Sequence, residues 1–65
     1  MDKQVFRSAA SLVHTSVDDA KSSLLCTPQS REVLNAALDM IDGKPGQTTR
    51  RKLLQHHLKN LAENK

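Results

Sequence analysis

The chain has 65 residues, a single cysteine, one aromatic residue (Phe6) and a formal net charge of +3. A chain this short holds at most one small core, whose stability often depends on help such as oligomerisation. One cysteine excludes an internal disulfide, and the lack of Tyr and Trp argues against binders of single-stranded nucleic acid, which stack bases on aromatic side chains.

Charge is distributed unevenly along the chain. Residues 1–46 carry five cations and six acids, a net charge of −1, whereas residues 47–65 carry five cations and one acid, a net charge of +4. The positive excess therefore lies entirely in the last stretch. No apolar run approaches the ~20 residues of a membrane span, and the N-terminus lacks the regions of a signal peptide. We expect a cytoplasmic protein that does not enter the membrane.

The first predicted element is a helix over about residues 3–25. Its apolar residues recur at steps of three and four, which is the helical period: Val5, Phe6, Ala9, Leu12, Val13, Val17, Ala20 and Leu24. A break is the alternative, because Ser16 followed by Asp19 resembles a capping box with Asp in place of Glu. We expect one continuous helix, long enough to project past the later helices. Its spare apolar surface would form a homodimer through Val5, Phe6, Leu12, Val13 and Val17.

The second predicted helix covers about residues 28–42. Pro28 disfavours a helical conformation at Thr27, as an N-cap requires, and itself suits the first helical position. The apolar stripe of this helix consists of Val33, Leu34, Ala37, Leu38, Met40 and Ile41. Gly43 ends the helix, and Pro45 and Gly46 prevent its continuation.

The third predicted helix covers about residues 49–62, with Thr48 or Thr49 as its N-cap. The five residues before it, 43–47, are a connection of the length that antiparallel neighbours use. Its apolar stripe consists of Leu53, Leu54, His57, Leu58 and Leu61. The sequence therefore predicts an all-α fold, a small three-helix bundle in which the long first helix packs on an antiparallel hairpin, and which we expect to be dimeric.

Cations open the third helix, where the helix end carries a partial positive charge and favours carboxylates instead. Such a helix either tolerates a small penalty or keeps a place for an anion. Arg50 lies at the top of the apolar stripe, where its stem can pack while its head reaches water or a partner. The residues predicted to bind a partner or nucleic acid are Lys44, Arg50, Arg51, Lys52, Gln55, His56 and Lys59.

Two functions fit this pattern. The first is a small, non-enzymatic regulatory protein, of the size found among bacterial or phage accessory proteins, that self-associates through its first helix and binds an acidic protein partner through its basic last helix. The alternative is a dimeric DNA-binding regulator whose last helix contacts phosphates and bases. The connection is a little long for a helix-turn-helix, and Glu32, Asp39 and Asp42 would face phosphates.

Catalytic, cofactor and metal sites are not expected. His56 and His57 are adjacent, so on a helix they point about 100° apart and do not share one metal ion. A catalytic cysteine needs an oriented base and a pocket, and so small a core has little room for one, so we expect Cys26 to be a buried or half-buried small side chain. The sequence therefore predicts neither an enzyme nor a small-molecule binder.

Overall fold

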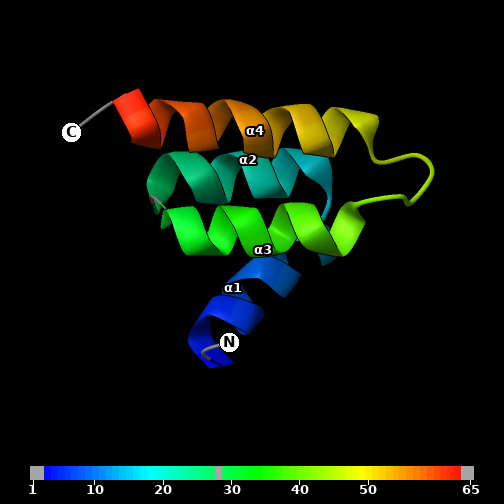
Figure 1. Ribbon diagram of the computed structural model, residues 1–65, viewed down its shortest axis with the longest axis horizontal. Coiled ribbons are helices and arrows are strands. Elements are labelled where there is room, and N and C mark those ends of the chain that lie inside the picture. Colours follow the sequence, from blue (N-terminus) through cyan, green and yellow to red (C-terminus); the bar gives the residue numbers. More distant parts are fainter. Residues whose placement is uncertain (1–2, 28, 64–65) are drawn as a thin grey trace.

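The computed structural model describes residues 3–27 and 29–63, and all regular structure within them is helical (Figure 1). The predicted all-α class is therefore confirmed for this part of the chain. The four helices are α1 (Lys3–His14), α2 (Val17–Cys26), α3 (Arg31–Ile41) and α4 (Thr48–Glu63).

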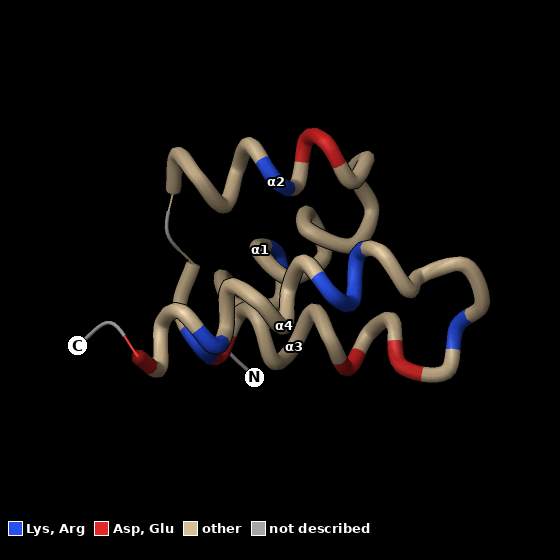
Figure 2. The backbone as a smooth tube through the Cα atoms, turned by 90° about the horizontal axis from the view of Figure 1, so that it is seen from above, with Lys and Arg blue, Asp and Glu red and all other residues tan. Residues whose placement is uncertain are grey.

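The helices pack around a hairpin formed by α3 and α4, which lie side by side and run in opposite directions (Figures 1 and 2). The predicted antiparallel hairpin is thus present. The first helix, α1, crosses this pair and packs mainly against α3, while α2 contacts both α1 and α4. The hairpin loop lies at one end of the molecule (Figure 1).

The continuous helix expected over residues 3–25 is wrong, and with it the count of three helices. Ser16 leaves the helical conformation, with φ −65° and ψ 157°, and its hydroxyl accepts a hydrogen bond of 3.1 Å from the Asp19 N–H. The weak capping signal therefore marks a true N-cap. Burial explains why the chain breaks here: the turn folds α2 back onto the bundle, where Ala20 and Leu24 are 0% and 5% exposed.

The start of α3 also differs from the prediction. Its N-cap is Ser30, whose hydroxyl accepts a hydrogen bond of 3.3 Å from the Val33 N–H. Thr27 instead ends α2, where its N–H donates to the Ser23 carbonyl. Serine and threonine are both good caps, so sequence alone did not separate these two positions. Pro28, the predicted first helical residue, lies outside the described residues.

The predicted end of this helix is confirmed, because α3 stops at Ile41 and Gly43 has φ 77°. Gly46 has the same φ, so the loop uses two residues that adopt the left-handed region without a Cβ penalty. The last helix begins at Thr48, one residue before its predicted start. Thr48 and Thr49 are therefore helical residues, and neither is the predicted N-cap. The Arg51 N–H donates to the Gln47 carbonyl at 2.8 Å.

The core is small and aliphatic. Its three large, fully buried side chains are Leu12, Leu34 and Leu54, so α1, α3 and α4 each contribute one. Around them lie the smaller and peripheral buried residues Ala9, Ala20, Leu24, Val33, Ala36, Ala37 and Ile41.

Candidate partner-binding site

Arg50 is buried at the interface of α4 with α1. Its side chain is 9% exposed, and Nη1 donates a hydrogen bond of 2.6 Å to the carbonyl oxygen of Leu12. That carbonyl lies in the last turn of α1, where carbonyls lack intrahelical partners and carry partial negative charge. We expected the guanidinium head to reach water or a partner, but it is buried. Arg50 is therefore not part of the exposed basic surface.

The other cations of this region gather around a hollow at the start of α4. Lys44, Arg51 and Lys52 are all exposed and line it together with Gln55. The remaining lining residues are Ile41, Gly43, Gln47 and Thr48, and none of these described residues is acidic. We call this site, of about 270 Å³, the basic hollow.

The loop brings these cations together from two segments. Gly43 and Gly46, both with φ 77°, turn the chain back after α3 and bring Lys44 to the start of α4. Figure 2 shows the basic position of the loop at one end of the molecule, the basic start of α4 further in, and acidic positions at the end of α3 near them. The fold thus joins Lys44 to Arg51 and Lys52, from which six or more residues separate it in the sequence.

One acidic side chain lies beside the basic hollow. Asp42 Oδ1 is 3.9 Å from Arg51 Nη2, and the two side chains are 73% and 54% exposed. An exposed pair of this kind contributes only about 0–1 kcal/mol. A carboxylate from outside can therefore compete with Asp42 for Arg51 at little cost.

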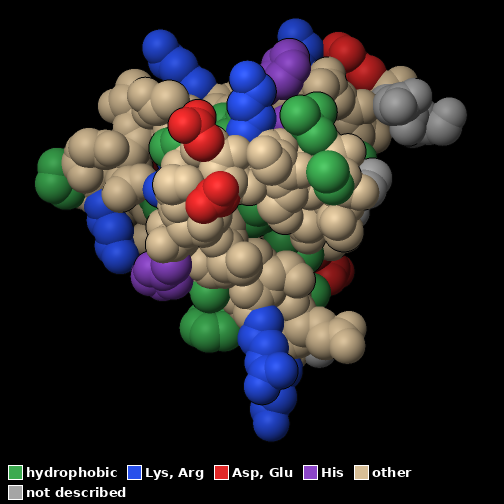
Figure 3. Space-filling model, turned by 180° about the vertical axis from the view of Figure 1, so that it is seen from behind, with side chains coloured by type: hydrophobic (Ala, Val, Ile, Leu, Met, Phe, Trp, Pro, Cys, Tyr) green, Lys and Arg blue, Asp and Glu red, His purple; other side chains and the backbone are tan. Residues whose placement is uncertain are grey.

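His56 and Lys59 do not line the hollow, although the sequence groups them with it. Both are exposed and lie further along α4. Seen from behind, Lys and Arg side chains project along the edge of the molecule that α4 forms (Figure 3). The predicted set is therefore divided into four residues around the hollow, two on the remaining surface of α4, and the buried Arg50.

His57 is partly buried and packs beside the core instead of facing a ligand. It lines a small hollow with Leu24, Leu34 and Leu61, among other residues. Burial, and secondarily the neighbouring His56, lower the pKa of His57 below its ordinary value of 6.5. The two rings lie edge to face, with centroids 5.9 Å apart. Among the described residues there is no cluster of three or more His, Cys, Asp or Glu that would hold a metal ion.

Cys26 is exposed at the end of α2, which corrects the expectation that it is buried or half-buried. Because the residue ends a helix, it does not lie at a helix N-terminus, a common position of reactive cysteines. The position therefore offers no support for a nucleophile.

Not all of the residues predicted to form a homodimer lie at the surface. Leu12 is 2% exposed and belongs to the core, whereas Phe6 is 55% exposed. Val5 and Val13 are partly buried against the core, and Val17 is intermediate in exposure. The break after His14 also removes the projecting half of the long helix on which the dimer was predicted.

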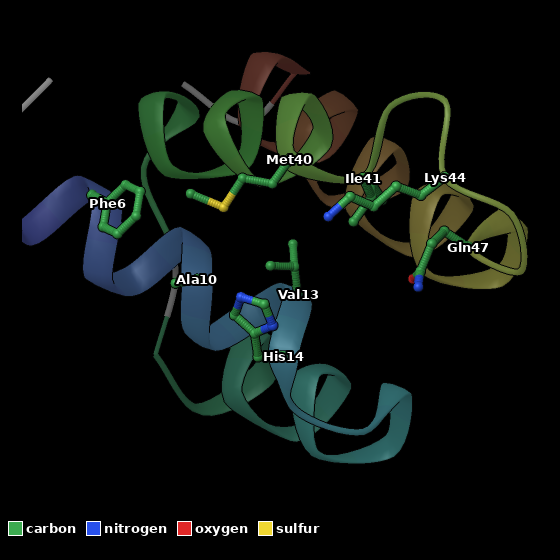
Figure 4. A pocket seen from close by; sticks show the side chains of 8 residues that line it. All are labelled: Phe6, Ala10, Val13, His14, Met40, Ile41, Lys44 and Gln47. Carbon is green, nitrogen blue, oxygen red and sulfur yellow. The ribbon is translucent and has the colours of Figure 1, made fainter.

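An apolar groove between α1 and α3 was missed in the sequence. It is lined by Phe6, Ala10, Val13, His14, Met40, Ile41, Lys44 and Gln47 (Figure 4). The spacing of Phe6, Ala10 and Val13, at i, i+4 and i+7, marks a second apolar line beside the core-facing stripe. That signal is present in the sequence but merges with the main stripe. We call this hollow, of about 320 Å³, the apolar groove.

Within the described part of the chain, no helix has both the length and the apolar character needed to cross a membrane. Comparison with protein-family models, with curated proteins and with solved structures finds no match to this chain.

Proposed function

We propose that this protein is a non-enzymatic interaction module that binds an acidic segment of a partner protein at the basic hollow. The observation that carries the proposal is the gathering of Lys44, Arg51 and Lys52 around one hollow whose described lining contains no acid. Three cations close together repel one another and attract carboxylates. The first-turn N–H groups of α4, which lack intrahelical partners, add to this attraction.

The chemistry of the lining favours binding over catalysis. Besides its cations, the basic hollow offers the hydroxyl of Thr48 and the amides of Gln47 and Gln55. These groups donate and accept hydrogen bonds, but none acts as a general base near neutral pH. An acidic segment would be held by charge and hydrogen bonds without any reaction.

An acidic protein fits this surface better than duplex DNA does. A helix-turn-helix joins its two helices at about 90–120°, whereas α3 and α4 lie antiparallel. Asp42 lies 3.9 Å from Arg51, and Asp39 is also exposed on α3. An extended polyanion laid across α4 would meet these carboxylates, but a short acidic segment can avoid them.

Self-association through α1 remains part of the proposal as a separate prediction. Phe6 and Val13 also line the apolar groove, so Val5 and Val17, both intermediate in exposure, are the predicted residues available to a second copy while that groove is occupied. The small core supports it, because domains of this size commonly gain stability by associating.

The test is a fluorescence anisotropy titration with two labelled probes, a short Glu-rich peptide and a mixed-sequence DNA duplex, at low and near-physiological salt. We expect the peptide to bind, and the double variant Arg51→Ala, Lys52→Ala to weaken binding about tenfold, or about 0.7 kcal/mol per cation. The control is Lys21→Ala, Arg31→Ala, which removes the same charge from exposed positions on α2 and α3. This control should change the affinity by no more than about twofold.

Two results would contradict the proposal. One is no peptide binding at low salt. The other is binding to the duplex alone, with a log–log salt slope of about −0.9 per neutralised phosphate that becomes less steep in the Arg51, Lys52 double variant. The second result would establish the DNA-binding alternative.

A further inference from the structure

The apolar groove and the basic hollow are adjacent parts of one surface. Both are lined by Ile41, Lys44 and Gln47, which lie at the end of α3 and in the loop that follows. A ligand that fills one of them therefore reaches the other without leaving the protein surface.

Resting on the proposed function, we infer that the partner segment is amphipathic and binds both sites at once. Its bulky apolar side chains occupy the apolar groove, and its carboxylates occupy the basic hollow. The ligand class is therefore an acidic amphipathic segment, such as a helix that presents apolar side chains at i and i+4 next to a cluster of Glu or Asp.

The apolar groove has the composition that such a segment needs. Phe6 lies at one end and Lys44 and Gln47 lie at the other, with Met40 and Val13 between them (Figure 4). Phe6 is 55% exposed, so covering its ring removes apolar surface from water. The flexible side chain of Met40 adapts its shape to different apolar ligands. The Lys44 side chain extends back toward the groove, where its amino group can meet a carboxylate beside an apolar anchor (Figure 4).

Charge complementarity decides which occupant we assign to the apolar groove. The wall formed by α1 carries the exposed cations Lys3 and Arg7, and the sequence of α1 contains no acid. Lys44 lines the groove itself, and none of the described lining residues is acidic. A second copy that docked with its own α1 would bring Lys3 and Arg7 against the same cations. An acidic segment instead finds opposite charge at Lys44 and on α1, and its carboxylates must lie away from the exposed Asp39 and Asp42 on the α3 side.

The shape of the site argues against a membrane surface. The apolar side chains line a hollow between two helices, and a flat bilayer does not follow the surface into a hollow. Peripheral membrane helices instead present a convex apolar face to the lipid. A narrow protein segment fits between α1 and α3.

The experiment compares two labelled peptides that carry the same number of glutamates. One has two leucines at i and i+4 beside the glutamates, and the other has serine at those positions. We expect the leucine peptide to bind about tenfold more tightly. Phe6→Ala should remove most of this advantage without weakening the binding of the serine peptide. Among the described residues, the other large exposed apolar side chain is Leu25 on α2, which is 70% exposed. Leu25→Ala should leave the advantage unchanged.

A direct readout supplements these variants. In protein with ¹³C-labelled methionine methyl groups, the Met40 methyl signal should shift on addition of the leucine peptide and shift much less with the serine peptide. This measurement uses the unaltered chain, so it remains decisive even if Phe6→Ala disturbs the fold.

The outcomes separate this inference from the proposed function. Equal affinity for both peptides, with an unchanged Met40 signal, overturns the inference that the segment is amphipathic. The proposal of an acidic partner is then unaffected. Failure of both peptides to bind overturns the proposed function as well. If the leucine peptide has no advantage, two further measurements show what occupies the groove instead. A loss of dimer mass by light scattering in Phe6→Ala would overturn the inference and assign the groove to a second copy. Phe6-dependent binding to phosphatidylserine vesicles would overturn it and assign the groove to a membrane.

Discussion

Arg50 Nη1 lies 2.6 Å from the carbonyl oxygen of Leu12, and this contact joins the start of α4 to the end of α1. A cation at the N-terminus of a helix is unfavourable for that helix, but a cation at a C-terminus is favourable. The Arg50 charge lies at the N-terminus of α4 and also at the C-terminus of α1. Its contact with the end of α1 therefore explains why a cation opens α4. Of the three cations at this position, only Arg51 and Lys52 are available to a partner.

Replacing Arg50 should destabilise the fold. Arg50→Met keeps an apolar stem but leaves the Leu12 carbonyl without its charged donor, so we expect the free energy of unfolding to fall by about 2–3 kcal/mol. Urea denaturation followed by circular dichroism measures this loss. Arg51→Met, at the exposed neighbouring position, is the control and should cost less than about 0.5 kcal/mol. Equal stability of the two variants would show that the buried hydrogen bond contributes little.

Sequence periodicity was enough to predict the helical class, the hairpin and most of the core. The last two helices carry clear stripes between strong end signals, and Gly43 has the positive φ that its position suggested. The first stripe was harder to interpret, because its period continues unbroken through Ser16. Periodicity records which side of a helix is apolar, but not whether the chain turns back on itself. That choice depends on the burial of Ala20 and Leu24 in the folded bundle.

The cap at Ser16 gives the second prediction. Its hydroxyl accepts from the Asp19 N–H at the start of α2, so Ser16→Ala should lower the free energy of unfolding by about 1 kcal/mol. Thermal melting followed by circular dichroism would detect this change. Ser22→Ala, at an exposed position inside α2, is the matched control and should be neutral or slightly stabilising, because alanine favours helix interiors. A Ser16 variant as stable as the Ser22 variant would argue against the cap.

The candidate site was only partly predictable for a similar reason. Charge counting pointed to the start of the last helix, and the fold does gather Lys44, Arg51 and Lys52 there. The same counting included Arg50, because nothing in the local sequence indicates that the end of α1 lies against it. The apolar groove likewise depends on how α1 crosses α3, which residue spacing within one helix does not specify.

The loop that shapes the basic hollow gives the third prediction. Gly43 has φ 77°, and a Cβ added there would meet nothing within 4 Å, so the cost of Gly43→Ala is purely conformational. We expect the free energy of unfolding to fall by about 1 kcal/mol, measured by urea denaturation. Gly43→Asn should cost clearly less, since asparagine tolerates the left-handed region better. An alanine variant with wild-type stability would mean that the loop adopts another conformation.

The fourth prediction concerns pH. Burial, and then the charge of His56, lower the pKa of His57 below 6.5, so the folded chain takes up this proton less readily than the unfolded chain does. Stability should therefore be complete above about pH 6.5 and should fall as the pH drops through the lowered pKa of His57. Urea midpoints between about pH 7.5 and pH 5.5 test this, because that range lies above the ordinary pKa of carboxyl groups, about 4. His57→Gln should flatten the dependence, and His56→Gln should reduce it only in part, because burial is the larger cause. If His57→Gln retains the full wild-type dependence, the pH sensitivity arises elsewhere in the chain.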